Sequence, residues 1–177
     1  MEIEYITNSN HDMFEKAMNL YKNSFPEFEQ RELFSQKKIL SDKEYHFGLI
    51  YDENVFSGLV LYWETNKFIY IEHLCIVPEL RGKNYGTNAL SLVCKMNKTV
   101  ILEIDPPVDT VSEKRLHFYK KCGFVKNDFK HIHPPYHRGN YGHSLVIMTY
   151  PKQITQNEYD YFNKYLEEKI MKNAFSS

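Results

Sequence analysis

The segment with the strongest chemical signature is a short basic stretch with two glycines, Arg81-Gly-Lys-Asn-Tyr-Gly-Thr87, which directly follows an apolar run. Gly82 and Gly86 leave room for a ligand to approach the backbone closely. If a helix begins here, its first amide N–H groups carry partial positive charge. Arg81 and Lys83 add full positive charges. The stretch therefore predicts a site for a phosphate or pyrophosphate group.

The same sequence pattern is also compatible with an ordinary strand-to-helix turn whose basic residues are solvated and bind no ligand. The stretch lacks the Gly-Lys-Ser/Thr of the Walker loop and the G-x-G-x-x-G of dinucleotide-binding folds. No acidic ribose-binding residue stands at the end of a parallel second strand. A nucleotide- or phosphate-binding protein of another fold stays open as an alternative at this point.

Hydrophobic periodicity predicts the elements that would position this stretch. Alternating or continuous apolar runs predict strands over residues 2–7, 45–52, 55–64, 68–77, 99–104, 124–131 and 144–150. Helical spacing predicts helices over residues 11–24, 28–41, after the basic stretch to about 94, 110 to about 121, and 156–173. The order is β-α-α-β-β-β-α-β-α-β-β-α. It indicates an α+β fold with a mixed, mostly antiparallel sheet flanked by helices.

Three helix starts carry capping signals. Ser9 or Asn10 would cap the first helix, and the boxes Thr110-Val-Ser-Glu113 and Thr155-Gln-Asn-Glu158 would open two later helices.

Composition limits the class of protein. A chain of 177 residues with 42% hydrophobic residues fits one globular domain, residues 1–177. The formal charge of -1 argues against a nucleic-acid partner, and no apolar run is long enough to span a membrane. The N-terminal residues lack a secretion signal. Cys75, Cys94 and Cys122 form no C-x-x-C pair, so we expect no disulfide framework and a cytoplasmic location.

Two blocks of this sequence resemble the GCN5-related N-acetyltransferase (GNAT) family. Val77-Pro-Glu-Leu-Arg-Gly-Lys-Asn-Tyr-Gly86 is similar to that family's acetyl-CoA loop, Q/R-x-x-G-x-G/A, and Arg115-Leu-His-Phe-Tyr-Lys-Lys-Cys-Gly-Phe124 is similar to its F-Y-x-x-x-G-F helix end. The resemblance covers the element order from about residue 2 to 150. Asn84 replaces the middle Gly of the loop, and Ser112 stands where many members carry Asn. Asn tolerates left-handed backbone angles, so the turn is expected to form.

The resemblance implies a single GNAT-like domain with acetyl-CoA as cosubstrate and a helix over 155–175 beyond the resembling part. The backbone of Cys75–Val77 would pair with the pantetheine arm as an added strand. A backbone N–H within Leu74–Ile76 would stabilise the oxyanion. The residues expected to bind the cofactor are Cys75, Ile76, Val77, Arg81, Gly82, Lys83, Asn84, Tyr85, Gly86, Thr87 and Ser112.

Acyl transfer to an amine needs a base, because amines are protonated at neutral pH. Glu72 lies in an otherwise apolar strand leading to the basic stretch, and partial burial at a cleft would suit it as the base. A surface Glu, or one paired with an Arg, is the structural alternative. His73 would point to the opposite face of a regular strand, but the resemblance implies a bulge, so His73 remains the reserve candidate.

Tyr119 is the candidate acid, because the resemblance places the Tyr of the F-Y pair beside the departing thiolate. A core Tyr on an amphipathic helix is its structural alternative. Cys75 raises the rival mechanism of an acyl-cysteine intermediate, but no neighbour in the sequence is committed to activating a thiolate there, so we expect direct transfer.

The sequence thus predicts an N-acetyltransferase acting on a small-molecule amine or an exposed amino group. The alternative is a catalytically weak acyl-CoA-binding or sensing protein of the same fold. His131-Ile-His133 would place two imidazoles on one strand face, but no further ligand follows at zinc spacing, so no metal is expected. The apolar stripe of the terminal helix would pack on its own domain, with a homodimer contact as the alternative.

Overall fold

The computed structural model describes residues 1–172 and 174–175. The chain divides into two compact units, residues 1–26 with 37–101 and residues 27–36 with 102–177, and each is described by itself. The predicted domain, 1–177, and the predicted terminal helix both include positions outside the described residues, and the single-domain extent stays a prediction. Among the described residues, no helix combines the length and the apolar character needed to cross a membrane.

The first unit is built on an antiparallel meander. Its strands follow chain order in the sheet: β1 (Glu2–Ile6), β2 (Tyr45–Asp52), β3 (Val55–Glu64) and β4 (Phe68–Ile76). The β2–β3 turn places Glu53 and Asn54 at positive φ, 49° and 65°. Short turns with such residues join antiparallel neighbours, which is why the sequence predicted the ends of β2 and β3 correctly.

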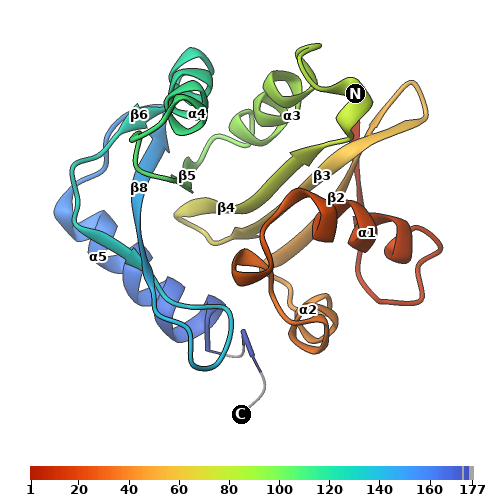
Figure 1. The fold of residues 1–177 in the computed structure, drawn as a ribbon, viewed down its shortest axis with the longest axis horizontal. Coiled ribbons are helices and arrows are strands. Elements are labelled where there is room, and N and C mark those ends of the chain that lie inside the picture. The colour runs from red at the N-terminus through yellow and green to blue at the C-terminus, as the bar shows by residue number, and fades with distance from the viewer. Residues whose placement is uncertain (173, 176–177) are drawn as a thin grey trace. The chain divides into compact units, whose positions relative to one another are not determined.

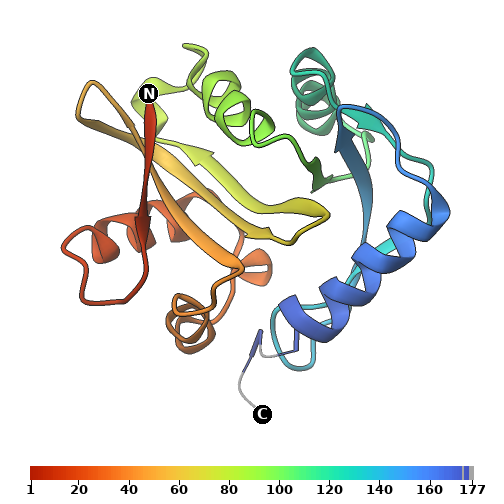
Figure 2. The ribbon, with the colours of Figure 1, turned by 180° about the vertical axis from the view of Figure 1, so that it is seen from behind.

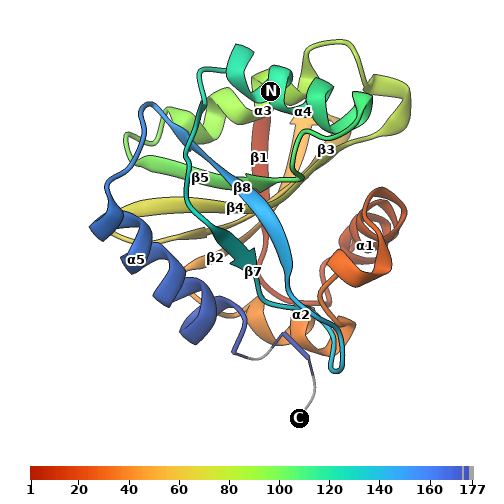
Figure 3. The same ribbon diagram turned by 60° about the vertical axis from the view of Figure 1, so that its left-hand side comes forward.

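Two helices of the first unit cover opposite faces of this sheet, α1 (Phe14–Ser24) and α3 (Tyr85–Cys94) (Figures 1 and 3). The predicted cap at Ser9 or Asn10 is wrong, because the N-cap residue of α1 is Met13. The residues before it form a turn instead: the Asn10 amide donates to the Asn8 side chain at 3.0 Å, and the Met13 amide donates to the His11 ring at 3.2 Å. Side chains that bond nearby backbone groups compete with helix formation in this way.

The predicted helix over 28–41 is broken into two pieces, a 3₁₀ turn η1 (Glu27–Glu29) and α2 (Leu33–Ile39). Arg31 lies between them and is buried at 3% exposure. Its guanidinium donates to Ser35 Oγ at 3.2 Å and to the carbonyl of Ile170 at 3.1 Å. This contact, 139 residues away in sequence, draws the segment into the second unit and overrides its weak helical pattern.

The second unit contains the strand order β5-β8-β6, with β7 also paired to β8. These strands are β5 (Thr99–Ile104, of which 102–104 belong to this unit), β6 (Val125–Lys126), β7 (His131–His133) and β8 (His143–Tyr150). The predicted strand over 124–131 is therefore two short strands. Asn127 separates them: its amide donates to the Val125 carbonyl and to Thr149 Oγ1, and its Oδ1 accepts from the Ile154 amide.

Of the two capping boxes predicted in the second unit, the structure corrects the one at the start of α4 and confirms the one at the start of α5. The cap of α4 (Thr110–Lys121) is Asp109, which accepts from the Val111 and Ser112 amides, so the predicted Thr110/Glu113 box is displaced by one residue. For α5 (Gln156–Tyr165), Thr155 and Glu158 form the predicted box. A π-helical turn, η3 (Leu166–Ile170), follows directly.

The apolar stripe of the C-terminal segment is covered by this chain. Phe162, Leu166 and Ile170 are all at most 1% exposed. Phe162 lies beside the ring of His131 on β7, with centroids 6.2 Å apart. Figure 2 shows α5 in blue, and Figure 3 labels both α5 and β7. The stripe therefore packs within the chain, as expected by default.

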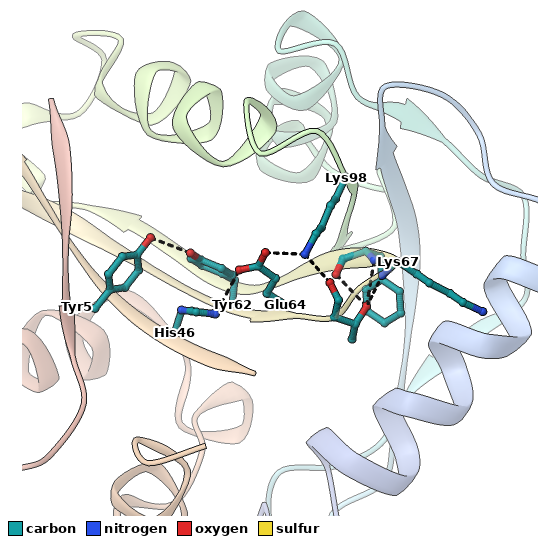
Figure 4. A network of polar contacts seen from close by, with 8 residues as sticks. Tyr5, His46, Tyr62, Glu64, Lys67 and Lys98 are labelled. Carbon is teal, nitrogen blue, oxygen red and sulfur yellow. Dashed lines mark hydrogen bonds and ion pairs between the residues drawn. The ribbon is translucent and has the colours of Figure 1, made fainter. Parts of the chain in front are cut away.

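A polar network on the first unit's sheet involves β1, β2 and β3 (Figure 4). Tyr5 and Tyr62 share a hydrogen bond of 2.8 Å, and the His46 ring stacks on Tyr62. Glu64 accepts from Lys98 Nζ at 2.6 Å and lies 3.3 Å from His46 Nε2. Burial lowers the pKa of His46, so its ring is largely neutral at pH 7.

Candidate active site

The β4 strand carries a bulge at the position of Glu72. His73 pairs with Leu61 of β3 and Ile71 pairs with Tyr62, so Glu72 has no partner residue in the ladder. Such an extra residue reverses the side-chain alternation that follows it. Glu72 and His73 therefore lie on the same face of the sheet, which a regular strand would forbid. The bulge that the resemblance implied is present.

The Glu72 side chain is half-buried and held from the neighbouring strand. Its Oε2 accepts a hydrogen bond of 2.9 Å from the indole Nε1 of Trp63 on β3. Trp63 is 1% exposed, and Tyr45 of β2 packs against its ring at a centroid distance of 4.9 Å. The carboxylate thus sits at the edge of a buried aromatic layer.

His73 occupies a different environment from Glu72. It is 7% exposed, and its ring makes edge contacts with Tyr21 and Phe25, at centroid distances of 4.9 and 4.6 Å. This aromatic packing against α1 suits a core residue. Because Glu72 is more accessible than His73, the geometry favours Glu72 as the base.

The backbone after the bulge presents amides on both sides of β4. The Val77 amide donates to Ser57 of β3 at 3.0 Å, and the same register pairs Leu59 with Cys75. In an antiparallel ladder, hydrogen bonding to one neighbour alternates along the strand. The N–H groups of Leu74 and Ile76 therefore point away from β3. One of them could donate to a ligand oxygen.

The basic stretch forms the predicted turn into a helix. Gly82 has φ 75° and Asn84 has φ 65° and ψ 5°, so both are left-handed, and Asn84 is the N-cap of α3. The Asn84 side chain makes no capping hydrogen bond. The first helical bond runs from the Asn88 amide to the Asn84 carbonyl at 3.0 Å.

The N–H groups of Tyr85, Gly86 and Thr87 precede that bond and have no carbonyl four residues back within the helix. They form the positively polarised start of α3. Arg81 and Lys83 lie exposed just before it. These groups together could hold a phosphate or diphosphate.

Two contacts fix the ends of this loop. Arg81 Nε donates to the Ile76 carbonyl at 3.0 Å, which ties the loop back to the end of β4. The Tyr85 hydroxyl bonds the carboxylate of Asp52, which joins the start of α3 to the β2–β3 turn. The loop is thus anchored to the same strand that carries Glu72.

The thiol of Cys75 is poorly suited to covalent catalysis. Its side chain is 8% exposed, and burial raises its pKa to about 11. A thiolate is therefore scarce at neutral pH. This argues for direct transfer over an acyl-cysteine intermediate.

Tyr119 lies in the second unit, near the end of α4. Its ring contacts Phe118 and Phe124 edge-on, with centroids 5.1 and 5.8 Å apart. Burial raises the pKa of its hydroxyl to about 12, so the hydroxyl keeps its proton at neutral pH. A protonated hydroxyl is the form that an acid needs.

Ser112 is 4% exposed, and its hydroxyl forms hydrogen bonds within the N-terminal cap of α4. Its Oγ accepts from the Val108 and Asp109 amides, each at 3.1 Å, and donates to Asp109. The structure gives Ser112 a capping role, and its contact with a cofactor stays a prediction.

The two histidines of His131-Ile-His133 converge on a carboxylate. His131 bonds Glu103 through Nε2 and the Tyr159 hydroxyl through Nδ1, and His133 Nε2 lies 3.7 Å from Glu103 Oε2. Among the residues that the structure describes, no group of His, Cys, Asp and Glu side chains has the arrangement of a metal site. The cluster instead links β5, β7 and α5.

The contact that sequence reasoning missed is the one between Trp63 and Glu72. The sequence allows Trp63 to be either a wall of an acceptor pocket or a core residue. Its hydrogen-bond partner depends on the strand register, which the sequence does not specify. A regular hairpin register with the turn at residues 65–67 brings Trp63 close to β4, but only the bulge fixes which side chain it meets.

Comparisons with known proteins agree with this geometry. The sequence profile of the acetyltransferase (GNAT) family matches residues 11–124. YjbC from Bacillus subtilis (strain 168), whose name assigns it provisionally to the acetyltransferases, is 32% identical over 68 residues, covering 37% of this chain and 35% of that protein. The match thus spans about a third of that relative's length.

Two solved structures extend the comparison to the fold. One from Bacteroides thetaiotaomicron, provisionally described as a GNAT-family acetyltransferase, is 25% identical over 97% of this chain and 98% of that chain, with a TM-score of 0.90. An aminoglycoside 6'-N-acetyltransferase complexed with coenzyme A is 14% identical over 88% of this chain and 100% of that chain, with a TM-score of 0.59.

The first likeness confirms the predicted fold class, an α+β fold with a mixed sheet flanked by helices. The family profile covers well over half of the chain and includes both the bulged strand and the loop that follows it. The chain belongs to the acetyltransferase (GNAT) family.

Proposed function

We propose that the protein is an acetyl-CoA-dependent N-acetyltransferase that transfers the acetyl group directly to a primary amine of a small molecule or of an exposed amino group. The observation that carries the proposal is the anchored turn at residues 81–87, where the left-handed Gly82 and Asn84 lead into the positively polarised start of α3, beside two exposed basic side chains. It follows the strand that bears Glu72.

The diphosphate of coenzyme A suits this turn. Amides of a helix start stabilise anions, and Arg81 and Lys83 add charge of the right sign. The backbone of Cys75, Ile76 and Val77 would hold the pantetheine arm through main-chain hydrogen bonds, as an added strand. In this arrangement the thioester would lie near the bulge.

Glu72 would act as the base. An alkylammonium with a pKa of ~10.4 costs about 4–5 kcal/mol to deprotonate at pH 7, so a carboxylate that receives the proton, directly or through a water, accelerates attack. An N–H of Leu74 or Ile76 would stabilise the oxyanion. Tyr119 would protonate the leaving thiolate.

One of the similar structures supports both substrates of the proposed reaction. The aminoglycoside N-acetyltransferase holds coenzyme A, and its name specifies an amine acceptor. The left-handed Asn84 supports an intact loop despite the missing Gly, because its backbone takes the angles that the turn requires.

The direct test is release of free thiol from acetyl-CoA over a panel of amines, with product mass confirming N-acetylation. Acetyl transfer to at least one amine is the expected result. A chain that binds acetyl-CoA in calorimetry but never releases thiol would be the sensing protein of the alternative. A chain that binds ATP and not coenzyme A would contradict both.

A matched pair of variants tests the loop. Gly86→Val places a branched side chain at the α3 start, where a phosphate would approach, and we expect the Kd for coenzyme A to rise by at least about tenfold. Asn88→Val introduces the same side chain two residues later, after the helical bonding begins, and should leave the Kd near that of the wild type. Equal affinities for the two variants would remove the loop assignment.

A further inference from the structure

The indole N–H of Trp63 is a buried donor with a charged acceptor. Trp63 is 1% exposed, and an indole N–H can only donate. Its hydrogen bond to Glu72 Oε2 measures 2.9 Å, within the range of a good N–H···O bond. Hydrogen bonds to charged groups are stronger than those between neutral groups.

The indole is itself held in one orientation. Trp63 lies opposite Tyr70 in the ladder, and Tyr45 packs against its ring. A donor fixed by packing restricts the carboxylate that it bonds, whereas a flexible surface Lys would not. The bulge matters here because it leaves Glu72 outside the β3–β4 ladder.

The donor is also neutral. A guanidinium in the same place would hold the carboxylate as well, but its full charge would make the carboxylate a much weaker base. An indole N–H orients the carboxylate with a smaller loss of basicity. This combination suits a residue that must accept a proton from an amine.

We infer that Trp63 is the positioning residue of the active site: its indole N–H holds the Glu72 carboxylate in the orientation that accepts the acceptor's proton. The inference rests on the proposed function, since it assigns Trp63 a part in the same reaction. Trp63 acts through Glu72 and need not touch either substrate.

The chain offers a direct spectroscopic test, because Trp63 is its only tryptophan. Emission excited at a wavelength selective for tryptophan reports this one indole. Titration of the free enzyme should give a change in emission whose midpoint coincides with the acid limb of kcat/KM. Glu72→Gln should abolish that change. An emission titration that persists unchanged in Glu72→Gln would overturn the inference.

Kinetics of Trp63→Phe provide the second test. The variant keeps an aromatic ring and loses the donor. We expect kcat/KM to fall about tenfold and its acid limb to move to higher pH, because the charged carboxylate loses a hydrogen bond. The Kd for coenzyme A should stay within about twofold. Tyr45→Phe, which alters the ring packed on the indole but leaves the donor, is the control and should keep the wild-type acid limb.

A double-mutant cycle separates this inference from the proposed function and from loss of folding. In a Glu72→Gln background, Trp63→Phe should have almost no further effect on kcat/KM, since no carboxylate remains to be held. Equal effects of Trp63→Phe in both backgrounds would make Trp63 purely structural and overturn the inference alone. If Glu72→Gln itself keeps wild-type kcat/KM, the base assignment in the proposed function fails as well.

Discussion

At the residue scale, the candidate site depends on the protonation that each environment allows. Burial keeps the Cys75 thiol and the Tyr119 hydroxyl protonated at neutral pH, while Glu72 accepts a neutral donor at a strand bulge. A carboxylate in an apolar strand identified Glu72 as a candidate, and the resemblance to the GNAT helix end identified Tyr119. Which of Glu72 and His73 is accessible could not be predicted from the sequence, because one inserted residue in the ladder decides it.

Tyr119→Phe should lower kcat with little change in the Kd for coenzyme A. General acids contribute roughly 10²–10⁴-fold to rate, and we expect a fall toward the lower end, since water can replace the proton donor in part. Because burial raises the pKa of Tyr119 to about 12, the basic limb of the wild-type profile below about pH 10 should be unchanged in the variant.

Steady-state rates from about pH 6 to 10 measure this, with Tyr141→Phe as the control, since Tyr141 is 94% exposed. A parallel loss of coenzyme A binding would show that Tyr119 is a structural residue.

At the element scale, local signals located most strands and helices but not all their ends. The turn with Glu53 and Asn54 at positive φ fixes the end of β2 and the start of β3. The capping box of Thr155 fixes the start of α5. The predicted range of α4 agrees with the structure, but its capping residue was off by one, since Asp109 and Thr110 both fit a capping pattern. Which of two adjacent cap-forming residues becomes the N-cap depends on which one has the extended backbone angles of that position. The amino-acid sequence does not specify these angles.

Ser112→Ala tests the α4 cap. Loss of a cap hydroxyl should lower the free energy of unfolding by about 1 kcal/mol, because the Asp109 amide loses its bond to Ser112 Oγ, while the Val108 amide keeps the Pro106 carbonyl as an acceptor. KM for acetyl-CoA should stay within about twofold. Chemical denaturation and initial rates give the two quantities.

Thr110→Ala is the matched control, because Thr110 is the cap that the sequence pattern favoured and the structure does not use. It should leave stability nearly unchanged. A rise in KM for Ser112→Ala without a loss of stability would instead make Ser112 a cofactor contact.

At the scale of the whole molecule, buried polar groups tie stability to pH. Burial lowers the pKa of His46 below its ordinary value, so the unfolded chain takes up a proton that the folded chain resists. The stability from His46 is present above about pH 6.5 and is lost as pH falls below it. Burial, together with the neighbouring His133, also lowers the pKa of His143, so His143 contributes to the same loss of stability at low pH.

His46→Phe should therefore reduce the loss of unfolding free energy between about pH 7.5 and pH 5, since the variant keeps a ring to stack on Tyr62 and has no imidazole to protonate. Urea denaturation at both pH values measures this. Tyr5→Phe removes a hydrogen bond of the same network, so it should cost about 1 kcal/mol equally at both. An unchanged pH dependence in His46→Phe would contradict the assignment.

The C-terminal stripe also belongs to this scale. Because Phe162, Leu166 and Ile170 are covered by their own chain, they leave no apolar stripe there for a second copy. A homodimer formed elsewhere on the surface stays a prediction, which sedimentation can test.

The sequence alone determined the features that depend on neighbours along the chain. Periodicity indicated the strands, and the glycines and basic residues of 81–87 indicated the turn into α3 that we propose binds the cofactor's phosphates, because backbone angles and local charge follow from adjacent residues. The tertiary structure alone decided the bulge at Glu72, the Trp63 hydrogen bond and the break at Arg31. Each of these depends on partners brought together by folding, and no local pattern encodes such contacts.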